Sequence, residues 1–185
     1  MFGKRIFTFK SLLHEMAAVF INIPSSISAR LHKRIDRVFA EKIRLAVTSV
    51  NGCIYCSYGH TKIAMIAGIP QNDIELLLKG EIGDNVSSHE TPALLFAQHY
   101  AETGGKPDPS MLMYLNEFYG SDAARDILVY LREIQFGNLS GNTFEAFISR
   151  LKRNASPGSN VCFEAAFFIL SFSLLGMLHI LVRQK

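Results

Sequence analysis

The chain has 185 residues, of which 49% are hydrophobic and 19% are charged. This composition excludes an intrinsically disordered chain, and the length is sufficient for one domain with its own core and a short appendage. The formal net charge of +3 is small and no cluster of Lys and Arg is interleaved with aromatic residues, so no nucleic-acid partner is expected. Three cysteines do not form the disulfide framework of a secreted mini-protein. A cytoplasmic protein with redox or metal chemistry is the expectation.

The N-terminal segment carries polar residues at intervals that rule out a signal peptide. Lys10, His14 and Glu15 interrupt the apolar residues between Ile6 and Ile21. The pattern indicates an amphipathic helix, from about residue 8 to residue 20, that stops before Pro24.

Helix signals continue along the rest of the chain, and no sustained polar–apolar alternation predicts a strand. Apolar residues recur at helical spacing over 35–50, Asn51-Gly52 then interrupts the helix, and the next helix is predicted from Cys53 to Ala67. Capping residues, Gly and Pro bound the remaining predicted helices, at about 71–79, 91–102, 109–119, 121–136 and 143–152. The expected fold class is all-α.

The string Glu41-x11-Cys53-x2-Cys56-x3-His60 carries the most chemical information in the sequence. If a helix begins near Cys53, Cys56 lies in its first turn, where free N–H groups and the helix dipole favour a thiolate. His60 follows Cys56 by one helical turn and is therefore expected on the same face, where its ring can accept a proton from either sulfur. If the two helices pack antiparallel across Asn51-Gly52, the carboxylate of Glu41 reaches the far nitrogen of His60 and fixes its tautomer.

These residue types suggest a peroxidase cycle. The Cys56 thiolate attacks a peroxide oxygen and becomes a sulfenic acid, and Cys53 condenses with it to a disulfide. A dithiol donor then reduces the disulfide by exchange.

Other interpretations of the same residues stay open. Cys53, Cys56 and His60 are three zinc-ligand types, and His89 or His99 would have to supply a fourth. Two inert buried thiols beside a core histidine are a further alternative. A non-catalytic redox sensor, which forms the disulfide without turnover, and a membrane-tethered interaction module are two more.

The spacing of these residues resembles the signature of alkyl hydroperoxidase D-like proteins of the carboxymuconolactone decarboxylase superfamily. Glu41, Cys53, Cys56 and His60 match that signature at every spacing, and the convincing part covers roughly residues 35–80. Residues 137–147 loosely resemble the closing helix of the family. The decarboxylase branch lacks the Cys pair, so lactone decarboxylation is a poor fit.

The resemblance implies a multi-helix fold that assembles into homo-oligomers and acts as an antioxidant peroxidase or disulfide reductase. It assigns Cys56 as the peroxidatic cysteine, Cys53 as the resolving cysteine, and His60 and Glu41 as a proton relay. It implies no bound cofactor or metal. An external dithiol, such as a lipoyl group on a partner protein, would supply electrons, and a peroxiredoxin is a second candidate partner. The best-known branch has His where this chain has Tyr55, so Tyr55 enters only as an accessory hydrogen-bond donor.

The C-terminal segment is strongly apolar. Ala165–Val182 contains eighteen residues without a formal charge, at the short edge of the length that spans a bilayer. It is a candidate membrane anchor, and the alternative is a helix buried between subunits. Cys162 lies beside it and is expected to be a small buried apolar residue.

The chain is therefore divided into four parts. Residues 1–34 form an N-terminal helical arm, 35–154 the alkyl hydroperoxidase D-like domain, 155–160 a linker, and 161–185 the hydrophobic C-terminal helix.

Overall fold

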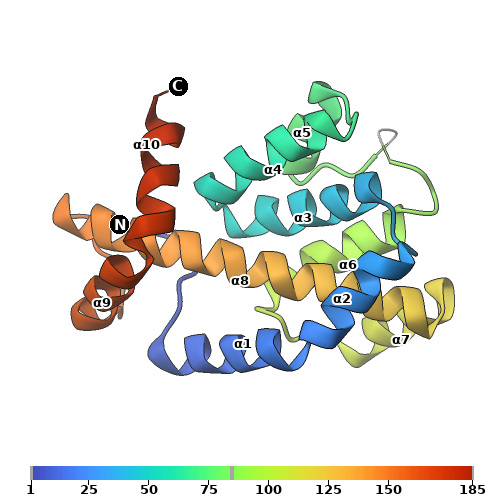
Figure 1. Cartoon of the computed structure of the whole chain (residues 1–185), viewed down its shortest axis with the longest axis horizontal. Helices are drawn as coiled ribbons and strands as arrows, with labels where there is room; N and C mark the ends of the chain where they lie inside the picture. The colour runs from blue at the N-terminus through green and yellow to red at the C-terminus, as the bar shows by residue number, and fades with distance from the viewer. Residues whose placement is uncertain (1, 84–85, 185) are drawn as a thin grey trace.

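The computed structural model describes residues 2–83 and 86–184. Two helices form the centre of the fold: α3 (Arg37–Asn51) and the long α8 (Ser121–Leu151) (Figure 1). The described residues form no strand, which confirms the all-α prediction. The remaining elements up to α8 are α1 (Phe9–Ile21), α2 (Ile23–His32), α4 (Ile54–Ile66), α5 (Gln71–Leu78), α6 (Thr91–Glu102) and α7 (Pro109–Tyr119).

Helix α3 is the core helix because apolar residues cover most of its circumference. Ile43 and the run Leu45–Val47 have no exposed surface, and α4, α5, α6 and α8 all pack against the helix. The helix begins where the Asp36 carboxylate accepts the Phe39 N–H at 2.9 Å.

The turn between α3 and α4 is tight. Gly52 ends α3 with φ of +64°, a conformation that glycine adopts without a steric penalty. The chain then reverses its direction, and α4 runs back alongside α3 (Figure 1). This turn places the start of α4 beside the middle of α8.

Two helix predictions were wrong. The helices expected at 121–136 and 143–152 are one continuous helix, α8. Gly137, Gly141 and Asn142 have low helix propensity, but tertiary contacts described below hold them in the helix. Helix α2 was not predicted because Pro24 was taken only as a stop, whereas it stands in the first turn of the new helix.

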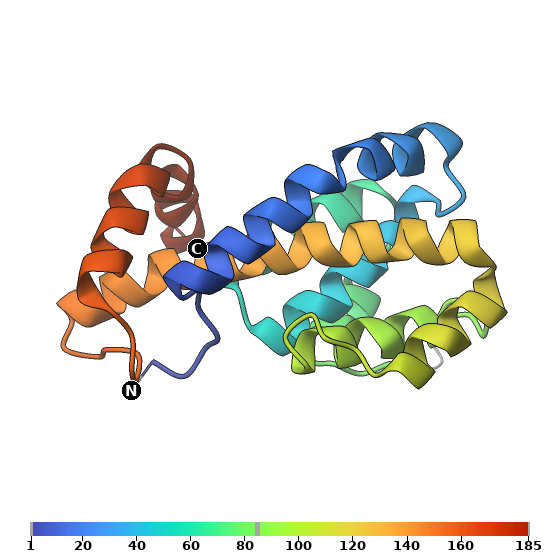
Figure 2. The same cartoon turned by 90° about the horizontal axis from the view of Figure 1, so that it is seen from below.

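The C-terminal segment consists of α9 (Val161–Ser171), a π-helical turn (Phe172–Gly176) and α10 (Met177–Arg183). The two views show α9 and α10 running in different directions, so the segment bends at the π-helical turn (Figures 1 and 2). The buried Glu164 carboxylate accepts a hydrogen bond at 2.7 Å from Arg150 Nε, which fastens the start of α9 to the end of α8.

The same segment keeps an exposed apolar outer face. Val161–Arg183 has a mean hydropathy of 2.3 and is long and apolar enough to cross a membrane. Ile169, Leu170 and Ile180 are largely exposed. Cys162, in the first turn of α9, is exposed as well, so the prediction of a buried residue was wrong. The division of the chain into four parts stays a prediction.

Candidate active site

The two cysteines lie at the start of α4, as predicted, and both are free thiols. Cys53 is the N-cap residue, and its sulfur accepts the Cys56 N–H at 3.4 Å. Cys53 has no exposed surface, whereas Cys56 is partly exposed. The two sulfurs therefore differ in access: a molecule that reaches the site meets Cys56 first.

The buried Cys53, and not the more accessible Cys56, has the lower pKa. The Cys56 thiol donates a hydrogen bond to the Cys53 sulfur and lowers the pKa of Cys53, an effect that exceeds the opposing effect of burial. The Cys56 N–H and the charge of Lys4 act in the same direction. The bond to Cys53, together with burial, raises the pKa of Cys56. The helix N-terminus thus favours a thiolate at Cys53, not at Cys56 as the sequence had suggested.

Two glycines of α8 make room for the sulfurs. A Cβ atom on Gly141 would lie 2.5 Å from Cys53 Sγ and 3.0 Å from Tyr55 Cδ2, which is too close for either contact. A Cβ atom on Gly137 would lie 3.9 Å from Cys56 Sγ, an ordinary van der Waals distance. Gly141 is thus required for the buried position of Cys53.

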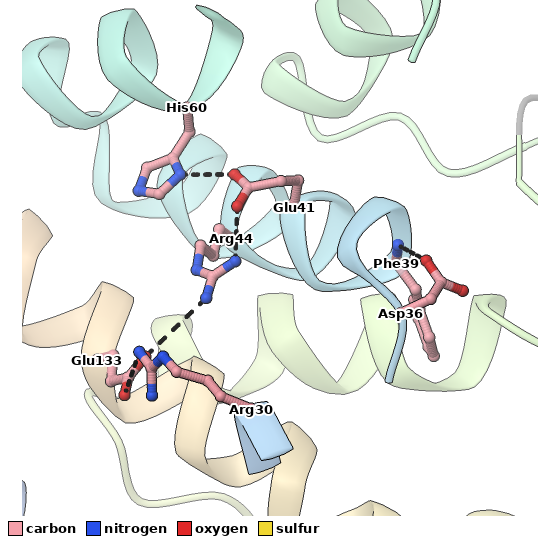
Figure 3. Close-up of polar contacts among 7 residues, drawn as sticks. All are labelled: Arg30, Asp36, Phe39, Glu41, Arg44, His60 and Glu133. Carbon is pink, nitrogen blue, oxygen red and sulfur yellow. Dashed lines mark hydrogen bonds and ion pairs between the residues drawn. The ribbon is translucent and has the colours of Figure 1, made fainter. Parts of the chain in front are cut away.

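The predicted contact between Glu41 and His60 is present. Glu41 Oε2 lies 2.7 Å from His60 Nδ1 (Figure 3). Because a carboxylate accepts, Nδ1 carries the proton and the lone pair of the neutral ring is on Nε2. Within the described ranges, His60 Nε2 has no hydrogen-bond partner.

Arg44 holds the other oxygen of Glu41. Its Nη1 donates to Glu41 Oε1 at 2.6 Å, and its Nη2 lies 4.0 Å from Glu133, which in turn binds Arg30 (Figure 3). Burial raises the pKa of Glu41, but the bonds from His60 and Arg44 outweigh burial, so the pKa lies below the ordinary value. Glu41 is therefore a buried carboxylate with both oxygens satisfied.

A cavity of about 540 Å³ opens over Cys56 and His60. Helix α4 and the middle of α8 form one side of it, and the C-terminal segment forms the other. Apolar side chains supply most of the lining, among them Ile63, Phe136, Phe167, Leu174 and Leu178. Cys53 does not line the cavity.

Tyr55 connects α4 to the C-terminal segment. Its hydroxyl lies 2.8 Å from His179 Nδ1, and Arg183 Nε donates to His179 Nε2 at 2.9 Å. Because Nε2 accepts, Nδ1 carries the proton and donates to the tyrosine oxygen. The Tyr55 ring packs edge-on against Phe144 of α8. Tyr55 therefore fastens α10 beside the cavity.

The histidines considered as a fourth zinc ligand lie elsewhere. His89 packs against Phe118 and Tyr119, and His99 Nε2 accepts the Asp108 N–H at 3.1 Å. Among residues 2–83 and 86–184, no three His, Cys, Asp or Glu side chains are grouped so that they could hold a metal ion.

Several residues of the site were not found in the sequence. Arg44 had a usable signal, because Glu41 and Arg44 stand three residues apart on a predicted helix. Gly137, Gly141 and His179 had none, since their positions depend on how distant helices pack.

The fold and the site together define an all-helical protein in which a C-x-x-C pair begins a helix beside a carboxylate-bound histidine. Residues 15–99, a segment that contains the Cys pair, Glu41 and His60, match the carboxymuconolactone decarboxylase family. No curated protein and no solved structure gives a significant match. The family contains both alkyl hydroperoxidase D-like peroxidases and decarboxylases, so the match defines the superfamily and not the reaction.

Proposed function

We propose that the chain is a thiol-dependent peroxidase that cycles a disulfide between Cys53 and Cys56. One observation carries the proposal: Cys56 and His60 line the same cavity, whereas their partners Cys53 and Glu41 do not line it. This arrangement gives each group one role.

The first half of the cycle oxidises Cys56. His60 Nε2 takes the proton of the Cys56 thiol, and Glu41 stabilises the imidazolium that forms. The thiolate attacks the distal oxygen of the hydroperoxide, the O–O bond breaks, and His60 returns the proton to the departing alkoxide. The products are the Cys56 sulfenic acid and an alcohol.

The second half forms and then reduces the disulfide. Cys53, whose lowered pKa favours the thiolate, attacks the Cys56 sulfur, and the hydroxide that leaves takes up a proton to become water. A dithiol donor then reduces the disulfide and is itself oxidised to a disulfide. The exposed sulfur, Cys56, is the one the donor can attack.

The cavity favours a narrow reductant. The C-terminal segment covers the site, so an extended dithiol arm fits the opening better than a folded protein surface does. We propose a lipoyl group on a partner protein as the donor, with a peroxiredoxin as a further electron acceptor. Self-association into a homo-oligomer is part of the proposal, and the exposed apolar side chains of α1 and α2, among them Phe20, Ile21 and Leu31, support it.

Single cysteine variants test the proposed function. Cys56→Ser should abolish peroxide consumption, whereas Cys53→Ser should permit one turnover and stall as a sulfenic acid that dimedone traps. Cys162→Ser, which removes the exposed cysteine outside the site, is the matched control and should keep full activity. Equal residual activity in Cys56→Ser and Cys53→Ser would contradict the assigned roles. A disulfide that forms once and that no dithiol recycles would instead identify a redox sensor.

A further inference from the structure

The wall of the cavity that faces Cys56 lies outside the segment that matches the family. Residues 15–99 supply α4, whereas the opposite wall comes from the C-terminal segment. Phe167, Leu170, Leu174, Leu175 and Leu178 all belong to that wall. The C-terminal segment therefore determines what surrounds a substrate above the reactive sulfur.

The lining excludes charge and offers apolar contact. No Asp, Glu, Lys or Arg lines the cavity in the part of the chain that the structure describes. Four residues with a hydroxyl group line the cavity: Tyr55, Ser140, Ser171 and Ser173. Ser171 donates to the Phe167 carbonyl at 2.6 Å, and Tyr55 is bound to His179. A substrate in this cavity gains binding energy in proportion to its apolar surface.

The volume matches a long ligand. About 540 Å³ lies within the range of small-molecule sites, roughly 300–1,000 Å³. Hydrogen peroxide would fill a small fraction of this space and make little apolar contact. Leu170 and Leu174 line the cavity and are also exposed to solvent, so an acyl chain can extend past them to the surface.

We propose that the C-terminal segment makes the cavity selective for fatty-acyl hydroperoxides over hydrogen peroxide. The inference rests on the proposed function, because it names the substrate class of that same site. The acyl chain packs between α8 and the C-terminal segment, and the hydroperoxide group lies against Cys56 and His60.

A substrate series with the full-length protein tests the selectivity. With dihydrolipoamide as reductant, kcat/KM should rise from hydrogen peroxide through tert-butyl hydroperoxide to monomeric linoleic acid hydroperoxide, by roughly tenfold or more overall. A second arm offers phospholipid hydroperoxide in phosphatidylcholine vesicles. Turnover in both arms supports the inference and identifies the bilayer as a source, whereas turnover of the monomeric acid alone supports it with free fatty acids as the source. Equal kcat/KM across the series would overturn the inference and leave the proposed function standing.

Two substitutions on α10 form a matched pair. Leu178→Ser removes an apolar wall residue and should lower kcat/KM for linoleic acid hydroperoxide by about tenfold, a larger loss than for hydrogen peroxide. Ile180→Ser makes a similar change on the exposed outer face and should alter neither. Equal losses for both substrates in Leu178→Ser would count against a wall that contacts the acyl chain.

A binding experiment on the wild-type protein tests acyl-chain binding separately from peroxidase activity. Oleic acid carries no hydroperoxide and should slow the alkylation of Cys56 by iodoacetamide in a saturable manner. Peptide mass spectrometry measures the rate of alkylation. The exposed Cys162 serves as an internal control and should react at an unchanged rate. Protection of Cys56 without turnover of any hydroperoxide would overturn the proposed function and still assign the cavity to acyl chains. No protection would overturn the inference, whatever the turnover.

Discussion

Helix α4 has two sides that pack very differently. On one side, Cys53 and Tyr55 lie so close to α8 that Gly141 has no room for a Cβ atom. On the other side, Cys56 and His60 face a cavity of about 540 Å³ beneath the C-terminal segment. Tight packing fixes the position of the Cys53 sulfur, whereas the open side leaves space for a ligand at the Cys56 sulfur.

The tight side should be the most sensitive to mutation. Gly141→Ala introduces a Cβ atom that overlaps Cys53 Sγ, and such overpacking costs about 1–3 kcal/mol in the free energy of unfolding. Gly137→Ala, one turn away on the same helix, meets only an ordinary contact. Its gain in helix propensity should leave stability unchanged or raise it by up to about 1 kcal/mol. Urea denaturation measures both, and similar effects for the two variants would show that the sides do not differ.

The carboxylate that orients His60 should give the next largest effect, as a dependence of stability on pH. Because the pKa of Glu41 is lower in the folded protein than its ordinary value, its contribution to stability is present above about pH 4.5 and disappears as the pH falls through the folded-state pKa. Glu41→Gln should therefore lose stability relative to the wild type at pH 6, and the difference should shrink by pH 3. Glu117→Gln on the exposed surface of α7 is the control. A constant difference between wild type and Glu41→Gln across this range would argue against the contact.

The contact between Tyr55 and α10 should give the smallest effect. Tyr55→Phe removes the hydroxyl that binds His179, and loss of one such hydrogen bond costs about 1 kcal/mol. We expect faster hydrogen exchange in α10 and unchanged exchange in α3. Tyr114→Phe, at an exposed position on α7, should change neither. Unaltered exchange in α10 would mean that apolar packing alone holds the segment.

The sequence was most informative where spacing along one or two helices decides the geometry. The start of α4 at Cys53 and the contact between Glu41 and His60 both follow from a helix–turn–helix of known lengths. Local propensity failed at 137–142, because the glycines pack against α4 and the side chains of Asn138 and Asn142 donate hydrogen bonds to Thr48 and Asn51 of α3.

The pKa order of Cys53 and Cys56 and the cavity could not be predicted from the sequence, because both depend on how the helices pack. The Cys56 thiol donates to the Cys53 sulfur at the N-cap, and this bond reverses the expected order of the two pKa values. For the C-terminal segment, hydropathy indicates that it avoids water. It does not indicate whether lipid, another subunit or the rest of the chain covers it.

The position of Cys53 at the N-cap also has an energetic consequence for the proposed redox cycle. Groups that stabilise its thiolate do so only in the dithiol form, since the disulfide carries no charge to accept the Cys56 N–H or attract Lys4. They therefore shift the equilibrium toward the reduced protein and raise the reduction potential of the Cys pair. The start of α4 thus acts as a thermodynamic bias toward the reduced state, which lowers the reducing strength that the partner must supply.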